Sequence, residues 1–268
     1  MRNRKSIKFG ENRVVDGGSD ERTMKNMLSA DQTIDAKAIP GLGSIARESL
    51  QERVYQELAK SLMHGVFAAG QVLRMQALAD TLQVSIMPVR EALARLVSDQ
   101  ALEMMPNRST RVPLINAERL EDLARVRCLI EGELVRLATP KTDKATIESL
   151  RDMTAACEAA FEKPLDDEQV NVTSGLNYQF HFTVYAKAGS EVLLPVVRSL
   201  WMQSGPFVRA SALVYGRNPS MTAVHHHWAL IDALDKGDAE AAVKALHCDI
   251  TQSFNLLRQD IADGEANE

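Results

Sequence analysis

Residues 71–112, QVLRMQALADTLQVSIMPVREALARLVSDQALEMMPNRSTRV, decide the fold of the first half of the chain. After residue 86 apolar residues recur every three or four positions, where Val89, Leu93 and Leu96 define one face of a helix. A tight corner at residues 83–85 separates this helix from an earlier one. Two short β-like runs follow, joined by a turn at residues 107–109. The stretch therefore predicts a winged helix-turn-helix, a fold whose second helix enters the major groove of DNA.

The second of these helices is expected to expose one face. Ser85 is placed to cap it, because a hydroxyl can accept a bond from an unpaired backbone N–H, and Pro88 falls within its first turn. Arg90 is the best candidate for a contact with a base edge or a phosphate, whereas Arg95 can pair with Glu91 one turn earlier. The outward residues are Ile86, Met87, Arg90 and Ala94.

The strings HGVFAAGQVL, LADTLQVS, MPVREALARL and NRSTRV occur in this order between Val54 and Val112. They resemble the DNA-binding domain of the GntR family of bacterial transcription regulators, and strings like VSxxPVREAL are highly specific. The chain departs from the family at Gln76, where Arg is frequent, and at Ile86, where a polar or basic residue is frequent. The resemblance implies double-stranded operator DNA as a partner and a homodimer that reads an inverted repeat. The DNA-binding candidates are Arg74, Gln76, Ser85, Met87, Arg90, Arg108 and Thr110.

Length and composition suit a globular protein of two domains, since 45% of the 268 residues are apolar. No run approaches the roughly 20 uninterrupted apolar residues of a membrane span, and no secretory h-region follows the basic start. We therefore expect a cytoplasmic protein without a membrane partner. Cys128, Cys157 and Cys248 lack CxxC spacing, which predicts reduced, buried thiols.

The net charge of −5 is unevenly distributed along the chain. Residues 1–43 carry eight basic and six acidic side chains, residues 44–113 carry eight and seven, and residues 114–268 carry 15 and 23. The excess of acidic residues therefore belongs to the C-terminal part. Arginines of the middle segment favour contacts with phosphates in the helix-turn-helix and wing. They are Arg74, Arg90, Arg95, Arg108 and Arg111.

Four segments are expected along the chain. Residues 1–43 lack sustained periodicity, which predicts a disordered extension. The winged helix-turn-helix is expected over residues 44–113, beginning with a helix over 44–64; an all-helical domain is expected over 114–262 and a tail over 263–268.

The all-helical segment predicts a bundle of six helices. Asn116 can cap a first helix that reaches Ala138, and further helices fit about 142–162, 167–187, 190–213, 219–235 and 238–261. The fold class is therefore mainly α, with an antiparallel bundle able to hold a ligand between its helices. In order and length these helices resemble the FCD effector domain of the FadR-type GntR regulators.

A basic residue interrupts the apolar stripe of the first bundle helix. Arg127 shares that face with Leu123 and Leu134, and a buried unpaired guanidinium is costly. Either Glu131 neutralises it one turn later, or the carboxylate of an anionic ligand does, since Arg presents a fork that matches carboxylates.

Further polar residues lie on the inner stripes of other bundle helices. Asn177 and His181 lie one turn apart on one face, and His227 is the inward member of the run His225–His227. In FCD relatives the residues at the positions of Asn177, His181 and His227 bind a metal, together with a His that lies 22 residues after the last of these positions. In this chain that position is Asp249. His247 is the alternative, two residues earlier. The metal candidates are Asn177, His181, His227 and Asp249, and the effector candidates are Arg127, Asn177, His181 and His227.

This set of nitrogen and oxygen donors suits Zn²⁺, Ni²⁺ or Mn²⁺. A metal-free polar pocket in which the histidines bind the ligand directly is the alternative. The leading hypothesis is a transcription regulator without enzymatic activity, more often a repressor in this family, whose operator affinity responds to a small organic acid. The other hypotheses are a metal-only sensor and a metal-dependent helical-bundle enzyme, since two His and a carboxylate can activate a bound water.

Overall fold

The computed structural model describes residues 49–217 and 224–265. The extension predicted for residues 1–43 lies outside the described residues. The first described helix, α2 (Leu50–Met63), begins later than the predicted helix over 44–64. Ser49 has extended backbone angles and caps α2, because its hydroxyl accepts a hydrogen bond from the N–H of Glu52 at 3.3 Å.

Two further helices form the helix-turn-helix, as predicted. α3 (Met75–Leu82) and α4 (Ile86–Ser98) are separated by a corner at which Gln83 adopts a left-handed conformation with a φ of 54°. Val89, Leu93 and Leu96 are at most 2% exposed, so the predicted apolar face of α4 is the buried one. Ser85 stands at the N-cap position, but its side chain makes no capping hydrogen bond, contrary to our prediction. Ser85 is exposed, so solvent can satisfy the backbone groups at this helix end.

The wing is a three-stranded antiparallel sheet with the strand order β1-β3-β2. β2 (Glu103–Met104) and β3 (Thr110–Arg111) are the two predicted runs, and Arg108 in the turn between them has a φ of 60°. β1 (Val72–Leu73) pairs its two residues with Arg111 and Thr110 of β3. The sequence does not indicate β1, because its partner β3 follows only after α3 and α4, whereas β2 and β3 are joined by a short turn.

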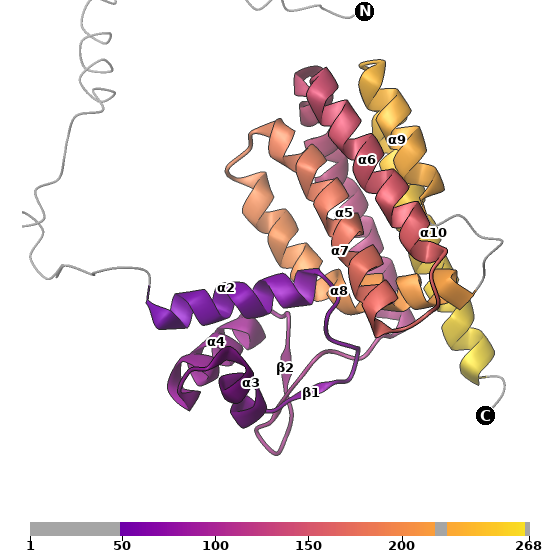
Figure 1. The fold of residues 1–268 in the computed structure, drawn as a ribbon. Helices are drawn as coiled ribbons and strands as arrows, with labels where there is room; N and C mark the ends of the chain where they lie inside the picture. Colours follow the sequence, from indigo (N-terminus) through magenta and orange to yellow (C-terminus); the bar gives the residue numbers. More distant parts are fainter. Residues whose placement is uncertain (1–48, 218–223, 266–268) are drawn as a thin grey trace, which may run out of the picture. The chain divides into compact units, whose positions relative to one another are not determined.

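Among the described residues six helices form the C-terminal bundle, as predicted (Figure 1). They are α5 (Ala117–Ala138), α6 (Lys144–Phe161), α7 (Asp167–Ala188), α8 (Leu193–Arg217), α9 (His225–Asp235) and α10 (Ala239–Glu265), with the 3-10 helix η1 (Thr139–Lys141) after α5. Asn116, Asp143 and Asp166 cap α5, α6 and α7, each accepting a backbone N–H at 2.8 Å. α10 extends to Glu265, into the segment predicted as a tail. The helix predicted over 219–235 corresponds to α9, and its predicted start at 219–223 lies outside the described residues.

The cysteines lie in three different bundle helices as free thiols. Only Cys157 is buried; Cys128 is half-buried and Cys248 is exposed, so the prediction of three buried thiols is wrong for these two. Asp249 of α10 lines the bundle cavity, and successive helix positions point about 100° apart. The preceding residue, Cys248, therefore points away from the cavity and is exposed. Within the described part of the chain, no helix is long and apolar enough to cross a membrane.

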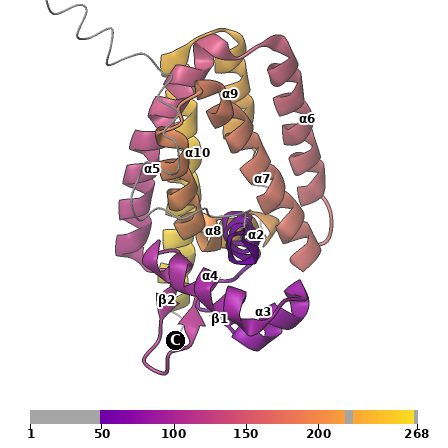
Figure 2. The ribbon, with the colours of Figure 1, turned by 90° about the vertical axis from the view of Figure 1, so that its left-hand side faces the viewer.

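The helix-turn-helix meets the bundle where α2 ends against α8 (Figure 1 and Figure 2). The carbonyl oxygen of Leu62 approaches Gly205 so closely that a Cβ at residue 205 would lie 1.7 Å from it. Pro206 follows inside α8, which bends partway along its length (Figure 1). A glycine is therefore required for this contact between the two parts.

Candidate functional site

The outer face of α4 is exposed, as the sequence predicts. Ile86 is 37% exposed and Met87 is 52% exposed. Arg90 and Ala94 are exposed on the same face. Because the opposite face of α4 is buried in the helix-turn-helix core, these side chains are free to enter a groove of DNA.

Arg95 of α4 is engaged within the fold. Its guanidinium pairs with Glu52 of α2 at 2.5 Å and lies 3.6 Å from the centre of the Tyr55 ring. The predicted pair with Glu91 is therefore wrong, because the packing of α2 on α4 brings in a partner 43 residues away in the sequence.

The other arginines of this region divide into two groups. Arg111 pairs with Glu103 across the wing at 2.5 Å. Arg74, Arg90 and Arg108 are exposed and have no ion-pair partner within residues 49–217 and 224–265. These three guanidinium groups are available for phosphates or base edges.

Two polar residues proposed for DNA contact are placed differently from each other. Gln76 is exposed on α3, where its amide donates to Asp80 at 2.8 Å. Thr110 is only 8% exposed, because it lies in the central strand of the wing. The structure therefore does not present Thr110 on the DNA-facing surface, contrary to our prediction.

A buried ion pair adjoins the cavity of the bundle. Arg127 is 4% exposed and Glu131 is fully buried; Arg127 Nε donates to Glu131 Oε1 at 2.6 Å, and Nη2 donates to Oε2 at 3.2 Å. Glu131 is thus the partner of Arg127, one of the two alternatives that the sequence leaves open. Arg127 also lines the cavity, and its Nη1 donates no hydrogen bond to any described residue. That nitrogen is the part of the guanidinium that Glu131 does not engage.

Tyr185 connects this ion pair to His181. Its hydroxyl donates to Glu131 Oε2, and its oxygen lies 3.2 Å from Nδ1 of His181. Burial raises the pKa of Tyr185, so the hydroxyl stays protonated. Because that proton points to Glu131, the oxygen of Tyr185 can accept the Nδ1–H of His181. The other ring nitrogen of His181, Nε2, then faces away from Tyr185 and toward Asp249.

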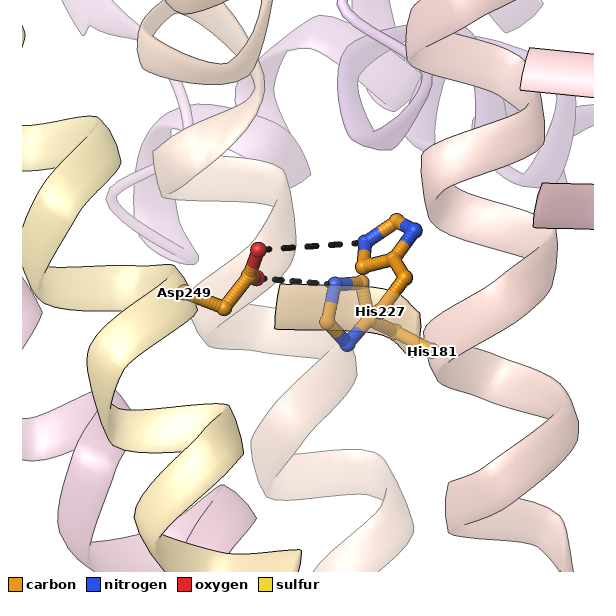
Figure 3. Close-up of side chains that lie close together, drawn as sticks. All are labelled: His181, His227 and Asp249. Carbon is orange, nitrogen blue, oxygen red and sulfur yellow. Dashed lines mark ion pairs between the residues drawn. The ribbon is translucent and has the colours of Figure 1, made fainter. Parts of the chain in front are cut away.

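His181, His227 and Asp249 converge from α7, α9 and α10 (Figure 3). The Asp249 carboxylate lies 3.2 Å from Nε2 of His181 and 3.8 Å from Nε2 of His227. One ligand atom from each residue lies within 4.8 Å of the others. His181 is 1% and His227 2% exposed, and neither ring nitrogen of His227 has a hydrogen-bond partner among the described residues.

The charge states of these groups favour a cation. Burial lowers the pKa of His227 to about 3, so its ring is neutral at neutral pH. Burial raises the pKa of the Asp249 carboxyl, but the hydrogen bond with His181 and the neighbouring imidazoles outweigh this effect and bring it to about 2. An ionised carboxylate and two imidazoles around one point are a fitting ligand set for a divalent metal.

The remaining polar candidates of the bundle surround this triad or point away from it. Asn177 is half-buried and lines the same cavity. His225 is exposed as predicted, whereas His226 is half-buried and bonds Gln252 at 2.5 Å. His247 lies outside the cavity, with Nε2 2.9 Å from the carbonyl oxygen of Cys128. Asp249 rather than His247 therefore faces the two histidines.

The cavity that contains the triad has a volume of about 60 Å³. Sequence reasoning did not identify much of its lining, which comes from α6, α7, α8 and α10: Cys157, Phe161, Thr173, Ser174, Phe207, Val208, Ser211, Ala212, Tyr215, Ile250, Ser253 and Phe254. Helical phase offered a signal for Ser174, which precedes Asn177 by three residues and His181 by seven. The α8 residues carry no such signal, because their position depends on how the helices pack.

A winged helix-turn-helix with free arginines on its outer surface, joined to a helical bundle with a polar cavity, defines a DNA-binding transcriptional regulator. Residues 50–112 match the family of bacterial regulatory proteins of the gntR type, and residues 122–252 match the FCD domain. The chain belongs to the GntR family and carries an FCD domain.

Relatives support this assignment over most of their length. The HTH-type transcriptional regulator McbR of Escherichia coli is 29% identical over 223 residues, which are 82% of this chain and 98% of McbR. The regulator BphR of Paraburkholderia xenovorans is 26% identical and matches 79% of this chain and 86% of its own length. The solved structure of McbR superposes with a TM-score of 0.71 at 27% identity, covering 80% of this chain and all of McbR.

Proposed function

We propose that this regulator is a homodimeric repressor whose operator affinity is controlled by a small organic acid bound in the bundle through a divalent metal. His181, His227 and Asp249 would hold the metal, with Asn177 beside them. The observation that carries the proposal is the convergence of these side chains on the cavity, with both nitrogens of His227 buried and unpartnered. A buried polar atom without a partner costs stability, and a ligand recovers that cost.

A metal at this site would supply positive charge for the carboxylate of the acid. Arg127 Nη1 is placed to donate to the same ligand, because the rest of its guanidinium is held by Glu131. Tyr185 would orient His181 from behind. These residues together recognise an anion that water no longer solvates.

The contact of α2 with α8 offers a route from the cavity to DNA. Phe207, Val208 and Ser211 line the cavity from α8, just beyond the Gly205 contact with Leu62. A ligand that displaced these residues would shift α2 and with it the helix-turn-helix. In a dimer this shift changes the spacing of two recognition helices, which must match two half-sites.

The lining of the cavity argues against an enzymatic role. Asp249 is the one carboxylate among the described residues that line the cavity, and it is assigned to the metal. No second carboxylate of the described lining is left as a general base for metal-bound water. The apolar walls beyond the triad, which include Phe207 and Phe254, favour an organic ligand over a metal-only sensor.

Operator binding after chelation tests the proposal. The full-length protein is dialysed against a chelator, and its affinity for operator DNA is measured with metal, with candidate organic acids, and with both. We expect an organic acid to weaken binding only when metal is restored. A response to metal alone would establish the metal-only sensor instead, and a response to acid without metal would remove the metal from the mechanism.

Variants separate the cavity from the rest of the bundle. His181→Ala combined with His227→Ala should abolish the response to the acid while leaving operator affinity intact, and the exposed His225→Ala is the matched control. A folded double variant that still responds would refute the assignment.

The coupling between the two sites must be the same in both directions. If the acid lowers the affinity for operator DNA by some factor, a saturating concentration of operator DNA must lower the affinity for the acid by the same factor. Size-exclusion chromatography with light scattering tests the dimer, and a reporter gene tests repression.

A further inference from the structure

Five hydroxyl groups of described residues line the cavity, and four of them have hydrogen-bond partners. The hydroxyl of Thr173 donates to a carbonyl of its own helix at 2.9 Å. Ser211 donates to the carbonyl of Ser253 at 3.2 Å, and the Ser253 hydroxyl bonds Tyr215. Ser174 is the exception, because its Oγ is buried and has no partner among the described residues.

The position of the Ser174 hydroxyl indicates a ligand. A serine inside a helix commonly bonds back to the carbonyl of the preceding turn, as its neighbour Thr173 does. Ser174 does not make that bond and is only 1% exposed, so its hydroxyl has no hydrogen bond to a described residue and is shielded from solvent. Native proteins seldom leave such a group unsatisfied. A polar atom in the cavity is therefore expected opposite it.

Ser174 lies at the opposite end of the polar stripe from the triad. Ser174, Asn177 and His181 occupy positions i, i+3 and i+7 on one face of α7. With a rise of about 1.5 Å per residue, Ser174 and His181 are separated by about 10 Å along the helix axis. The cavity thus has a metal-binding end and a second end that offers a single neutral hydroxyl donor or acceptor.

Charge distinguishes these two ends. The described lining contains one arginine, Arg127, and no lysine. Apart from Arg127, Asp249 and the two histidines, the described lining is uncharged, and Cys157 Sγ lies 3.8 Å from the carbonyl oxygen of Thr173, the residue before Ser174. A carboxylate placed beside Ser174 would be a buried charge without a cation, whereas a hydroxyl or carbonyl group would need only the hydrogen bond of Ser174.

We infer that the effector is a small monocarboxylic acid with a neutral hydroxyl or carbonyl group at its far end, and that Ser174 is the residue that selects it. This inference rests on the proposed function, since the carboxylate is assigned to the metal end. A cavity of about 60 Å³ holds on the order of four to six water-sized groups. Bonded atoms lie closer together than separate waters, so a small acid of a few carbon atoms matches that size.

Matched trios of acids test the inference on the full-length, metal-containing protein. Each trio contains a plain acid, its terminal hydroxy analogue and the dicarboxylate of the same length: for four carbons, butyrate, 4-hydroxybutyrate and succinate. Calorimetry should show that the wild type binds the hydroxy acid about 3- to 10-fold more tightly than the plain acid. The dicarboxylate should bind most weakly.

Ser174→Ala should remove the preference for the hydroxy acid without lowering the melting temperature, because the substitution deletes an unsatisfied group. Thr173→Val is the matched control and should keep the preference, since the Thr173 hydroxyl is bonded to its own helix. A structural role for Ser174 would instead lower the melting temperature and leave the preference unchanged, which would overturn the inference.

Other outcomes distinguish this inference from the proposed function. Acid binding that is lost in His227→Ala but is indifferent to Ser174 would overturn the inference and leave the proposed function standing. Tightest binding by the dicarboxylates would overturn the assignment of a neutral far end. If none of the acids bound to the wild type, both the inference and the organic-acid part of the proposed function would fall.

Discussion

The DNA-binding face and the bundle cavity arrange their polar groups in opposite ways. On α4, Arg90 and Met87 point to solvent while the apolar residues are buried behind them. In the bundle, Arg127, His181 and His227 point inward and are at most 4% exposed. DNA is a large polyanion that solvated charges can bind at a surface. A small ligand gains affinity where water is excluded and the partners are already aligned. The same residue type, arginine, should therefore respond differently to substitution in the two places.

The largest effect is expected from breaking the buried ion pair. Glu131→Ala leaves the Arg127 guanidinium buried without its carboxylate, so the free energy of unfolding should fall by about 3–5 kcal/mol. Glu133→Ala is the control on the same helix, because Glu133 is half-exposed and lies 3.6 Å from Arg136. Its effect should stay below about 1 kcal/mol. Urea denaturation measures both, and similar losses would contradict the distinction between buried and exposed charge.

A smaller loss is expected where the two regions meet. Gly205→Ala introduces a Cβ 1.7 Å from the Leu62 carbonyl oxygen, and the backbone must move. Overpacking of this kind should lower the free energy of unfolding by about 1–3 kcal/mol. The displaced α2 should also change operator affinity.

Gly216→Ala is the control for this contact on the same helix. Its new Cβ would meet a tip of the Leu165 side chain at 2.6 Å, and a side chain can rotate away. Denaturation and fluorescence anisotropy with operator DNA should therefore show a smaller change than Gly205→Ala. If the two variants had equal effects on operator affinity, the Leu62 contact would not be the joint between the regions.

The next comparison separates two arginines of α4. Arg90→Ala should weaken operator binding by about 1–3 kcal/mol if Arg90 contacts a base edge. Arg95→Ala should weaken it by less than about 1 kcal/mol, since Glu52 and Tyr55 already engage Arg95. Anisotropy titrations at one salt concentration measure both. A loss at Arg95 that equals the loss at Arg90 would assign the DNA contact to a different part of the helix.

The elements of the fold were predictable because they depend on local pattern. The spacing of Val89 and Leu93 predicts the buried face of α4, and Asn116 marks the start of α5 correctly. A helix period or a cap is complete within a few residues, so it is visible in the sequence. The partner of Arg95 was not predictable, because Glu52 lies 43 residues away and only the packing of α2 on α4 brings it near.

The candidate site was predictable only in part for the same reason. Family spacing placed Asp249 opposite the histidines, and helix phase placed His227 inside. Tyr185 was missed although it follows His181 by one turn, because a tyrosine on an inner face is ordinarily part of the core. The orphaned hydroxyl of Ser174 could not be predicted, since a missing hydrogen bond is a property of three-dimensional packing.

The smallest effect on stability is expected at the start of α4, where the two regions also differ. Asn116 in the bundle accepts a backbone N–H at 2.8 Å, so Asn116→Ala should cost about 1 kcal/mol of unfolding free energy. Ser85 makes no such bond and is exposed, so Ser85→Ala should change stability by only a few tenths of a kcal/mol.

The Ser85 hydroxyl and the free N–H groups at the start of α4 are instead available to a DNA phosphate. Ser85→Ala should therefore weaken operator binding slightly. Paired denaturation and anisotropy measurements on the two variants decide this. If Ser85→Ala were as destabilised as Asn116→Ala and bound operator DNA with unchanged affinity, Ser85 would act as a helix cap. It would then not be a DNA contact.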